Sequence, residues 1–186
     1  FMSIQFLING FGTDCMAAYT AASKVDSFAE MPALNLGQAM TNFAAQNYGA
    51  KKMDRVIKGG KSALVMGVGV SVLISTVICL FPSSFISIFN RDPGVIQIGN
   101  SYLRTVSVFY FVFAAMQILN GILLGYGKSF VPMLASIGSL CLMQVPAAIT
   151  LSGTSLGYNG IWIAAPIGWF GGLTIRFLYF RYIARK

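Results

Sequence analysis

Three long stretches of this chain contain no charged residue, and they determine the solvent in which it can fold. They extend over residues 62–90, 105–127 and 129–175. About 20 consecutive apolar residues cross the ~30 Å hydrocarbon core of a bilayer. The first two stretches are each long enough for one crossing, and the last is long enough for two. The chain is therefore predicted to be an integral membrane protein.

The composition argues against a soluble domain and indicates an all-α fold. Charged residues make up 10% and hydrophobic residues 56% of the chain, whereas soluble domains contain roughly 25% charged residues. Only helices and closed β-barrels cross a bilayer, and the apolar stretches lack the strict alternation of barrel strands. We therefore expect an all-α integral membrane protein.

The expected helices follow the apolar stretches. A long helix is predicted over residues 16–48, and further crossings are predicted near residues 62–80, 102–126, 130–151 and 161–179. Residues 1–11 have the pattern of the last part of another crossing, with neither the basic start nor the cleavage site of a signal peptide. The prediction is five complete transmembrane helices and part of a sixth, in a chain whose start has been cut away.

Three prolines lie within the expected crossings, namely Pro32, Pro146 and Pro166. A proline inside a helix removes one backbone hydrogen bond and clashes with the preceding turn. We expect the helices to bend at these positions.

The net charge of +8 reflects topology rather than nucleic-acid binding. Lys and Arg gather in residues 51–61, at Lys128 and in residues 176–186. Because cytoplasmic loops of membrane proteins collect Lys and Arg, these segments are placed in the cytoplasm, and residues 90–94 and 152–160 are placed outside. The expected location is the cytoplasmic (inner) membrane, crossed several times, with a cytoplasmic C-terminus.

The sequence favours neither an enzyme nor a metal site. It contains no His, and Cys15, Cys79 and Cys141 are scattered without metal-ligand or disulfide spacing. No catalytic triad or phosphate-binding loop is recognisable. Proton transfer would fall to carboxylates, because His, the usual proton carrier near neutral pH, is missing. No resident cofactor is expected.

The long helix over residues 16–48 carries ionisable groups at or near membrane depth. They are Lys24, Asp26 and Glu30. Such groups cost roughly 2.5–3.5 kcal/mol each to insert, so they usually serve a function or are paired. Asp26 and Glu30 share one helical face and are the candidates for ion coupling. The alternative is that both lie near the outer headgroups.

A second set of polar residues suggests a cavity. The candidates for a substrate cavity are Lys24, Asn35, Gln38, Asn42, Gln117 and Asn120. The first four follow one side of the long helix, together with Gln46, and are expected to line water. Gln117 and Asn120 interrupt an apolar segment, where they either face a pocket or hydrogen-bond to a neighbouring helix.

Several segments resemble, in the same order along the chain, landmarks of the multidrug and toxic compound extrusion (MATE) transporters. The first group covers residues 17–22, 31–39 and 46–52 with Arg55, and it is similar to the second helix and first inner loop of a lobe. The later landmarks are residues 80–82, 89–93, 102–104, 120–127, 145–146 and 160–162. The resemblance covers nearly the whole chain.

The resemblance implies an architecture of twelve helices in two six-helix lobes, with a substrate cavity between them. This chain would be a single transmembrane lobe over residues 1–186, comprising a truncated helix 7 through helix 12, and the N-terminal lobe would be its missing partner. Such proteins exchange cationic or amphipathic drugs or metabolites for H⁺ or Na⁺ by alternating access. The implied partners are the lipid bilayer and small organic cations.

The resemblance also leaves questions open. Some sodium-coupled members carry an acidic residue in the tenth helix, and residues 109–124 contain none; Asp26 and Glu30 are substitute candidates. One alternative is a flippase for lipid-linked sugars, whose cavity should hold several cations, of which only Lys24 qualifies. The other is a membrane scaffold that transports nothing, for which the polar stripe would be dry.

Overall fold

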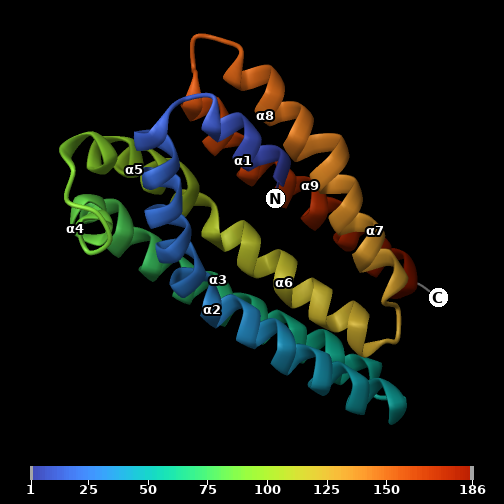
Figure 1. Cartoon of the computed structure of the whole chain (residues 1–186). Helices are drawn as coiled ribbons and strands as arrows, with labels where there is room; N and C mark the ends of the chain where they lie inside the picture. Colours follow the sequence, from blue (N-terminus) through green and yellow to red (C-terminus); the bar gives the residue numbers. More distant parts are fainter. Residues whose placement is uncertain (1, 185–186) are drawn as a thin grey trace. The chain divides into compact units, whose positions relative to one another are not determined.

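The computed structural model describes residues 2–184, with side chains for residues 4–183, and every regular element in this range is helical (Figure 1). The all-α prediction is confirmed. The α-helices are α1 (Met2–Asn9), α2 (Thr13–Gly49), α3 (Met53–Leu80), α4 (Pro82–Ser87), α5 (Pro93–Val106), α6 (Tyr110–Gly125), α7 (Phe130–Gly138), α8 (Val145–Ser152) and α9 (Tyr158–Ala184). A 3₁₀ turn, η1 (Ser107–Phe109), joins α5 to α6, and a π-helical segment, η2 (Ser139–Gln144), joins α7 to α8.

Within the described residues, 4 helices are long and apolar enough to cross a membrane. They are Met53–Leu80, Pro93–Gly125, Phe130–Ser152 and Tyr158–Ile183. The fifth predicted crossing is α2, whose 37 residues include the polar and charged groups singled out above, and it is not among these four. Residue 1 lies outside the described residues, and so do residues 185–186, which belong to the predicted cytoplasmic C-terminus.

The chain divides into two compact units. Among the described residues, unit 1 comprises 2–29, 73–109 and 140–168, and unit 2 comprises 30–72, 110–139 and 169–184. Four of the five points at which the chain passes between units lie at or near irregular points of its helices, and the fifth lies within α3. Two of them are η1 and the start of η2, and two others lie close to Pro32 in α2 and Pro166 in α9. Prolines and π-segments are the usual places where helices depart from straight geometry.

The three prolines expected to bend helices have different local surroundings. Pro32 and Pro166 lie inside α2 and α9, which continue as helices on both sides. Pro146 lies in the first turn of α8, directly after η2. A proline is tolerated in the first turn because its missing N–H would have no partner there. A π-segment, η2, thus ends two residues before Pro146, and a bend at this proline stays a prediction.

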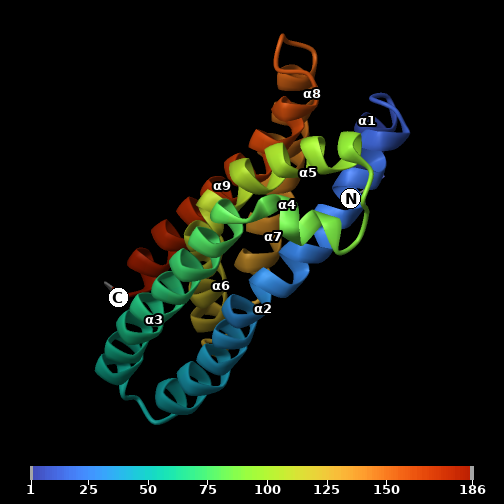
Figure 2. The same cartoon turned by 90° about the vertical axis from the view of Figure 1, so that its left-hand side faces the viewer.

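In unit 1, α4 lies against α5 (Figures 1 and 2). The Asp92 side chain caps α5 by accepting hydrogen bonds from the backbone N–H groups of Gly94 (2.8 Å) and Val95 (3.4 Å). Ile86 of α4 is fully buried and packs where α5 has Gly99; a Cβ there would lie 2.8 Å from the Ile86 side chain. The cap and the close packing against α4 fix the position of α5, which contributes a residue to the candidate site of unit 1.

In unit 2, α2 and α6 approach closely through small residues. A Cβ on Gly37 would lie 2.8 Å from the carbonyl oxygen of Gln117, and one on Gly125 would lie 2.7 Å from that of Thr41. A Cβ on Gly121 would overlap the carbonyl group of Gly37. Small residues at regular spacing let helix backbones pack this closely inside membranes.

We expect the Gly121→Ala variant to unfold at a lower temperature than the parent protein. The added methyl group has no space against Gly37, and overpacking of this kind costs about 1–3 kcal/mol. The measurement is the thermal unfolding midpoint in detergent. Gly138→Ala is the matched control, because nothing lies within 4 Å of its new Cβ. Equal midpoints for the two variants would contradict the close approach.

The prediction that residues 51–61 form a loop is wrong. Only a short turn joins α2 to α3 (Figure 2), with Lys51 in the left-handed region at φ 58°. Arg55, Lys58 and Lys61 lie on the first turns of α3, which begins at Met53. The helix start was predicted at the first uncharged residue, but charged side chains at a helix end leave its backbone hydrogen bonds intact, and α3 begins at Met53.

Candidate ion-coupling and substrate sites

A buried carboxylate lies in unit 1, on the part of α2 that belongs to it. Asp26 is 9% exposed, and its Oδ2 accepts a hydrogen bond from the hydroxyl of Tyr102 at 2.5 Å. Tyr102 itself comes from α5 and is buried. Packing within the protein therefore encloses the Asp26 carboxylate, and its depth in the bilayer stays a prediction. The sequence identified the carboxylate but gave no indication of its tyrosine partner.

Aromatic rings surround this hydrogen bond. The ring of Tyr19 lies parallel to that of Trp162, with centroids 5.9 Å apart. The Tyr102 ring meets both edge-on, at 5.8 Å from Tyr19 and 4.9 Å from Trp162. Trp162 comes from α9, so α2, α5 and α9 all contribute to the cluster within unit 1. We call these four residues, Tyr19, Asp26, Tyr102 and Trp162, the aromatic–carboxylate cluster.

The cluster can hold a small cation or a proton. A carboxylate oxygen accepts either one, and the faces of tyrosine and tryptophan rings attract cations. The buried indole N–H of Trp162 has no hydrogen-bond acceptor among the described residues. A buried donor of this kind usually has a partner, so this N–H is available to one further oxygen atom.

Glu30, the second carboxylate, has a different environment. It lies one helical turn after Asp26 on α2, is half-buried, and belongs to unit 2, whereas Asp26 belongs to unit 1. The structure therefore does not place the two predicted ion-coupling residues in one compact unit. Asp26 has the more enclosed surroundings.

The predicted polar stripe lies on the surface of unit 2. Asn35, Gln38 and Asn42 are all exposed on α2. Gln38 and Thr41 lie with Gln117 and Asn120 of α6 around a small pocket of about 120 Å³. The structure thus brings Gln38 together with Gln117 and Asn120, two predicted cavity residues that lie far from it in the sequence.

Lys24 and this stripe belong to different units. In unit 1, the Nζ of Lys24 lies 5.3 Å from the centre of the Phe89 ring. The prediction that Lys24 shares one cavity surface with the amides came from helical spacing alone, and the structure gives it other neighbours.

Arg176 is a residue whose partners were not predicted from the sequence. It was counted with the basic residues of the C-terminal end, and it is 2% exposed inside unit 2. Its Nε donates to Oδ1 of Asn120 at 3.2 Å, and its Nη1 donates to the carbonyl of Gly172 at 2.9 Å. Its Nη2 donates to the carbonyl of Pro132 at 3.1 Å and to Oγ of Ser136 at 2.6 Å.

These contacts connect three helices around one guanidinium group. Asn120 lies on α6, Ser136 on α7 and Arg176 on α9. Asn120 therefore has both of the roles that the sequence left open, since it lines the small pocket and hydrogen-bonds to a neighbouring helix. An arginine within an apolar helix, matched by an asparagine within another, was the available signal for this pair.

Comparison with known proteins agrees with this fold. The family model described as MatE matches residues 1–150. The probable multidrug resistance protein YoeA of Bacillus subtilis is 28% identical over 190 residues, which cover 100% of this chain and 40% of YoeA. The probable multidrug resistance protein NorM of Thermotoga maritima is 26% identical over 170 residues, covering 91% of this chain and 37% of NorM.

A solved structure is also similar in fold. The D35N mutant of the MATE transporter VcmN from Vibrio cholerae superposes with a TM-score of 0.90 at 22% sequence identity, over 100% of this chain and 43% of that protein. This chain thus spans less than half the length of the proteins it matches. Since the family model covers most of the sequence, the chain belongs to the multidrug and toxic compound extrusion (MATE) family of multi-pass membrane proteins.

Proposed function

We propose that this chain is the C-terminal lobe of a secondary antiporter in the cytoplasmic membrane. The intact protein would export cationic or amphipathic drugs or metabolites in exchange for H⁺ or Na⁺, by alternating access between two lobes. The segment around residues 51–61 and the C-terminus would face the cytoplasm. The names of the relatives, which are probable multidrug resistance proteins, support the choice of substrate class.

The buried carboxylate of Asp26 carries the proposal. An ionisable side chain in a membrane helix is costly and is usually retained for function. Asp26 is enclosed by aromatic rings and accepts the Tyr102 hydroxyl, so binding or release of one ion there changes the charge and hydrogen bonding at three helices. A transporter needs such a link, because ion binding must favour one conformation over the other.

The uncharged lining of the small polar pocket of unit 2 favours contact with a cationic group over contact with a pyrophosphate. Its lining residues are Leu34, Gly37, Gln38, Thr41, Gln117, Asn120, Gly121 and Leu124, none of which is charged. Amide oxygens accept hydrogen bonds from organic ammonium groups, whereas a pyrophosphate would need cations. The pocket therefore supports the antiporter over the flippase.

The proposal is tested with the intact protein in sealed lipid vesicles. Ethidium, a fluorescent amphipathic cation, is followed while a pH gradient or a Na⁺ gradient is imposed. We expect transport driven by one of the two gradients and abolished when that gradient is collapsed. Ethidium movement that ignores both gradients would refute ion-coupled antiport, and protein-free vesicles provide the baseline.

A further inference from the structure

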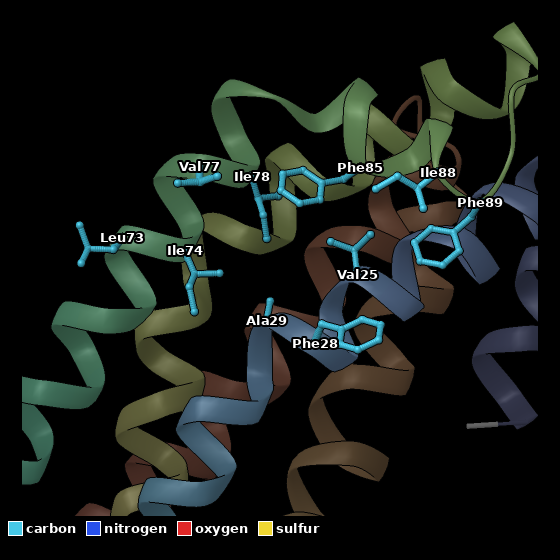
Figure 3. A pocket seen from close by; sticks show the side chains of 10 residues that line it. All are labelled: Val25, Phe28, Ala29, Leu73, Ile74, Val77, Ile78, Phe85, Ile88 and Phe89. Atoms are coloured by element: carbon cyan, nitrogen blue, oxygen red, sulfur yellow. The ribbon is translucent and has the colours of Figure 1, made fainter.

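A groove lined entirely by hydrocarbon side chains opens on unit 1 (Figure 3). One wall is α2, the other is α3, and α4 with the two residues that follow it closes one end. Its volume is about 590 Å³, and it is lined by Val25, Phe28, Ala29, Leu73, Ile74, Val77, Ile78, Phe85, Ile88 and Phe89. The exposed fractions of Phe28 (67%) and Ile88 (73%) are large for apolar residues. The groove therefore presents a continuous apolar surface to which another apolar group can bind.

A cation lies at the end of this groove. Phe89 lines both the groove and a second, more polar pocket of about 380 Å³. The polar side chains of that second pocket are those of Thr13, Thr20, Lys24 and Asn90. The ammonium group of Lys24 lies 5.3 Å from the centre of the Phe89 ring. Apolar and cationic surfaces therefore meet at one phenyl ring.

We propose that the groove binds one acyl chain of an anionic phospholipid, whose phosphate is held by Lys24. The two surfaces match the two parts of such a lipid, since lipid phosphates attract Lys side chains and acyl chains cover apolar surface. A cationic drug is disfavoured as the occupant because the Lys24 ammonium would repel it. The volume is within the roughly 300–1,000 Å³ range of small-molecule sites.

This lipid site is independent of the proposed coupling role of Asp26. Asp26 does not line the groove, and the lipid would bind whether the transported ion is H⁺ or Na⁺. The hydroxyl groups of Thr13 and Thr20 and the amide of Asn90 add hydrogen-bonding groups near the phosphate position. The lipid would fasten α2, α3 and α4 together at one end of unit 1.

The test uses the intact protein in nanodiscs of phosphatidylcholine, with a tryptophan introduced as Phe28→Trp. Phospholipids with brominated acyl chains, either phosphatidylglycerol or phosphatidylcholine, are added at the same low mole fraction. Bromine quenches tryptophan at close range, and the parent protein supplies the background of its other tryptophans. Phe130→Trp, at a position that is 64% exposed in unit 2, is the control reporter.

We expect brominated phosphatidylglycerol to quench the Phe28→Trp reporter at lower mole fraction than brominated phosphatidylcholine. Lys24→Gln should remove about a fivefold preference, which is the contribution of one basic residue near a lipid phosphate. Lys24→Arg should keep it, and Lys58→Gln, at an exposed position in unit 2, should change nothing at this reporter. The control reporter should show no dependence on residue 24.

Three results would overturn the proposal. Equal quenching by the two lipids would show that the groove does not select an anionic headgroup. An unchanged preference in Lys24→Gln would show that Lys24 does not hold the phosphate. A reporter that neither lipid quenches would show that another part of the protein, or a second copy of it, covers the groove instead.

Discussion

Replacing Asp26 by Asn is expected to abolish ion-driven transport by the intact protein. The amide has nearly the same shape and still accepts the Tyr102 hydroxyl, but it can neither bind a proton in the physiological range nor neutralise Na⁺. Coupling energies of about 1–3 kcal/mol correspond to roughly 5- to 150-fold effects, and we expect a loss of about tenfold or more. The measurement is the initial rate of ethidium movement into vesicles under the active gradient.

Three further variants separate coupling from folding. Tyr102→Phe keeps the carboxylate and removes its donor, so it should change the ion concentration for half-maximal rate more than the maximal rate. Glu30→Gln tests the second carboxylate, and combining it with Asp26→Asn should add little to the single change. Asp54→Asn, at an exposed position near the start of α3, is the matched control. Normal gradient-driven transport by Asp26→Asn would remove Asp26 from the mechanism.

Replacing Arg176 by Met is expected to destabilise the protein more than any other single change discussed. The guanidinium group donates to Asn120, Ser136 and two backbone carbonyls, all within unit 2. Hydrogen bonds to a charged group contribute about 1.5–3 kcal/mol each, and acceptors left buried without a donor add a desolvation cost. We expect a loss of about 3 kcal/mol or more, measured as the detergent-induced or thermal unfolding midpoint.

The control and the rescue use neighbouring positions. Arg181→Met removes an exposed arginine of α9 that lies against the Phe177 ring, and it should change the midpoint little. The double variant Arg176→Met with Asn120→Leu should regain part of the lost stability, because it removes the orphaned acceptor as well. A midpoint for Arg176→Met equal to that of Arg181→Met would show that the buried network contributes nothing.

Much of the fold was predictable because membrane helices are specified by length and hydropathy. The long helix expected over residues 16–48 is α2 (Thr13–Gly49), and the last crossing, expected over residues 161–179, is α9 (Tyr158–Ala184). The boundaries moved outward because polar residues at a bilayer surface stay helical. The single-lobe organisation and the missing N-terminal lobe remain predictions.

For the sites, the sequence predicted which types of residue take part but not which residues they contact. The cost of a charge in an apolar segment singled out Asp26, but its hydrogen-bond partner Tyr102 comes from a helix 76 residues away in the chain. Lys24 was grouped with the amides of α2 because periodicity alone cannot show which neighbouring helix a side chain meets. The partners of Arg176 were not predicted because counting charges ignores tertiary hydrogen bonds.

The most direct test of ion-coupled antiport is whether substrate flux drives ion movement. Vesicles holding the intact protein are loaded with ethidium and diluted into medium without ion gradients, while a pH-sensitive dye and radioactive Na⁺ report the ions. Coupling between two ligands is reciprocal, so outward ethidium flux should drive H⁺ or Na⁺ inward, and Asp26→Asn should stop it. Ethidium flux that moves neither ion would contradict antiport through this buried carboxylate.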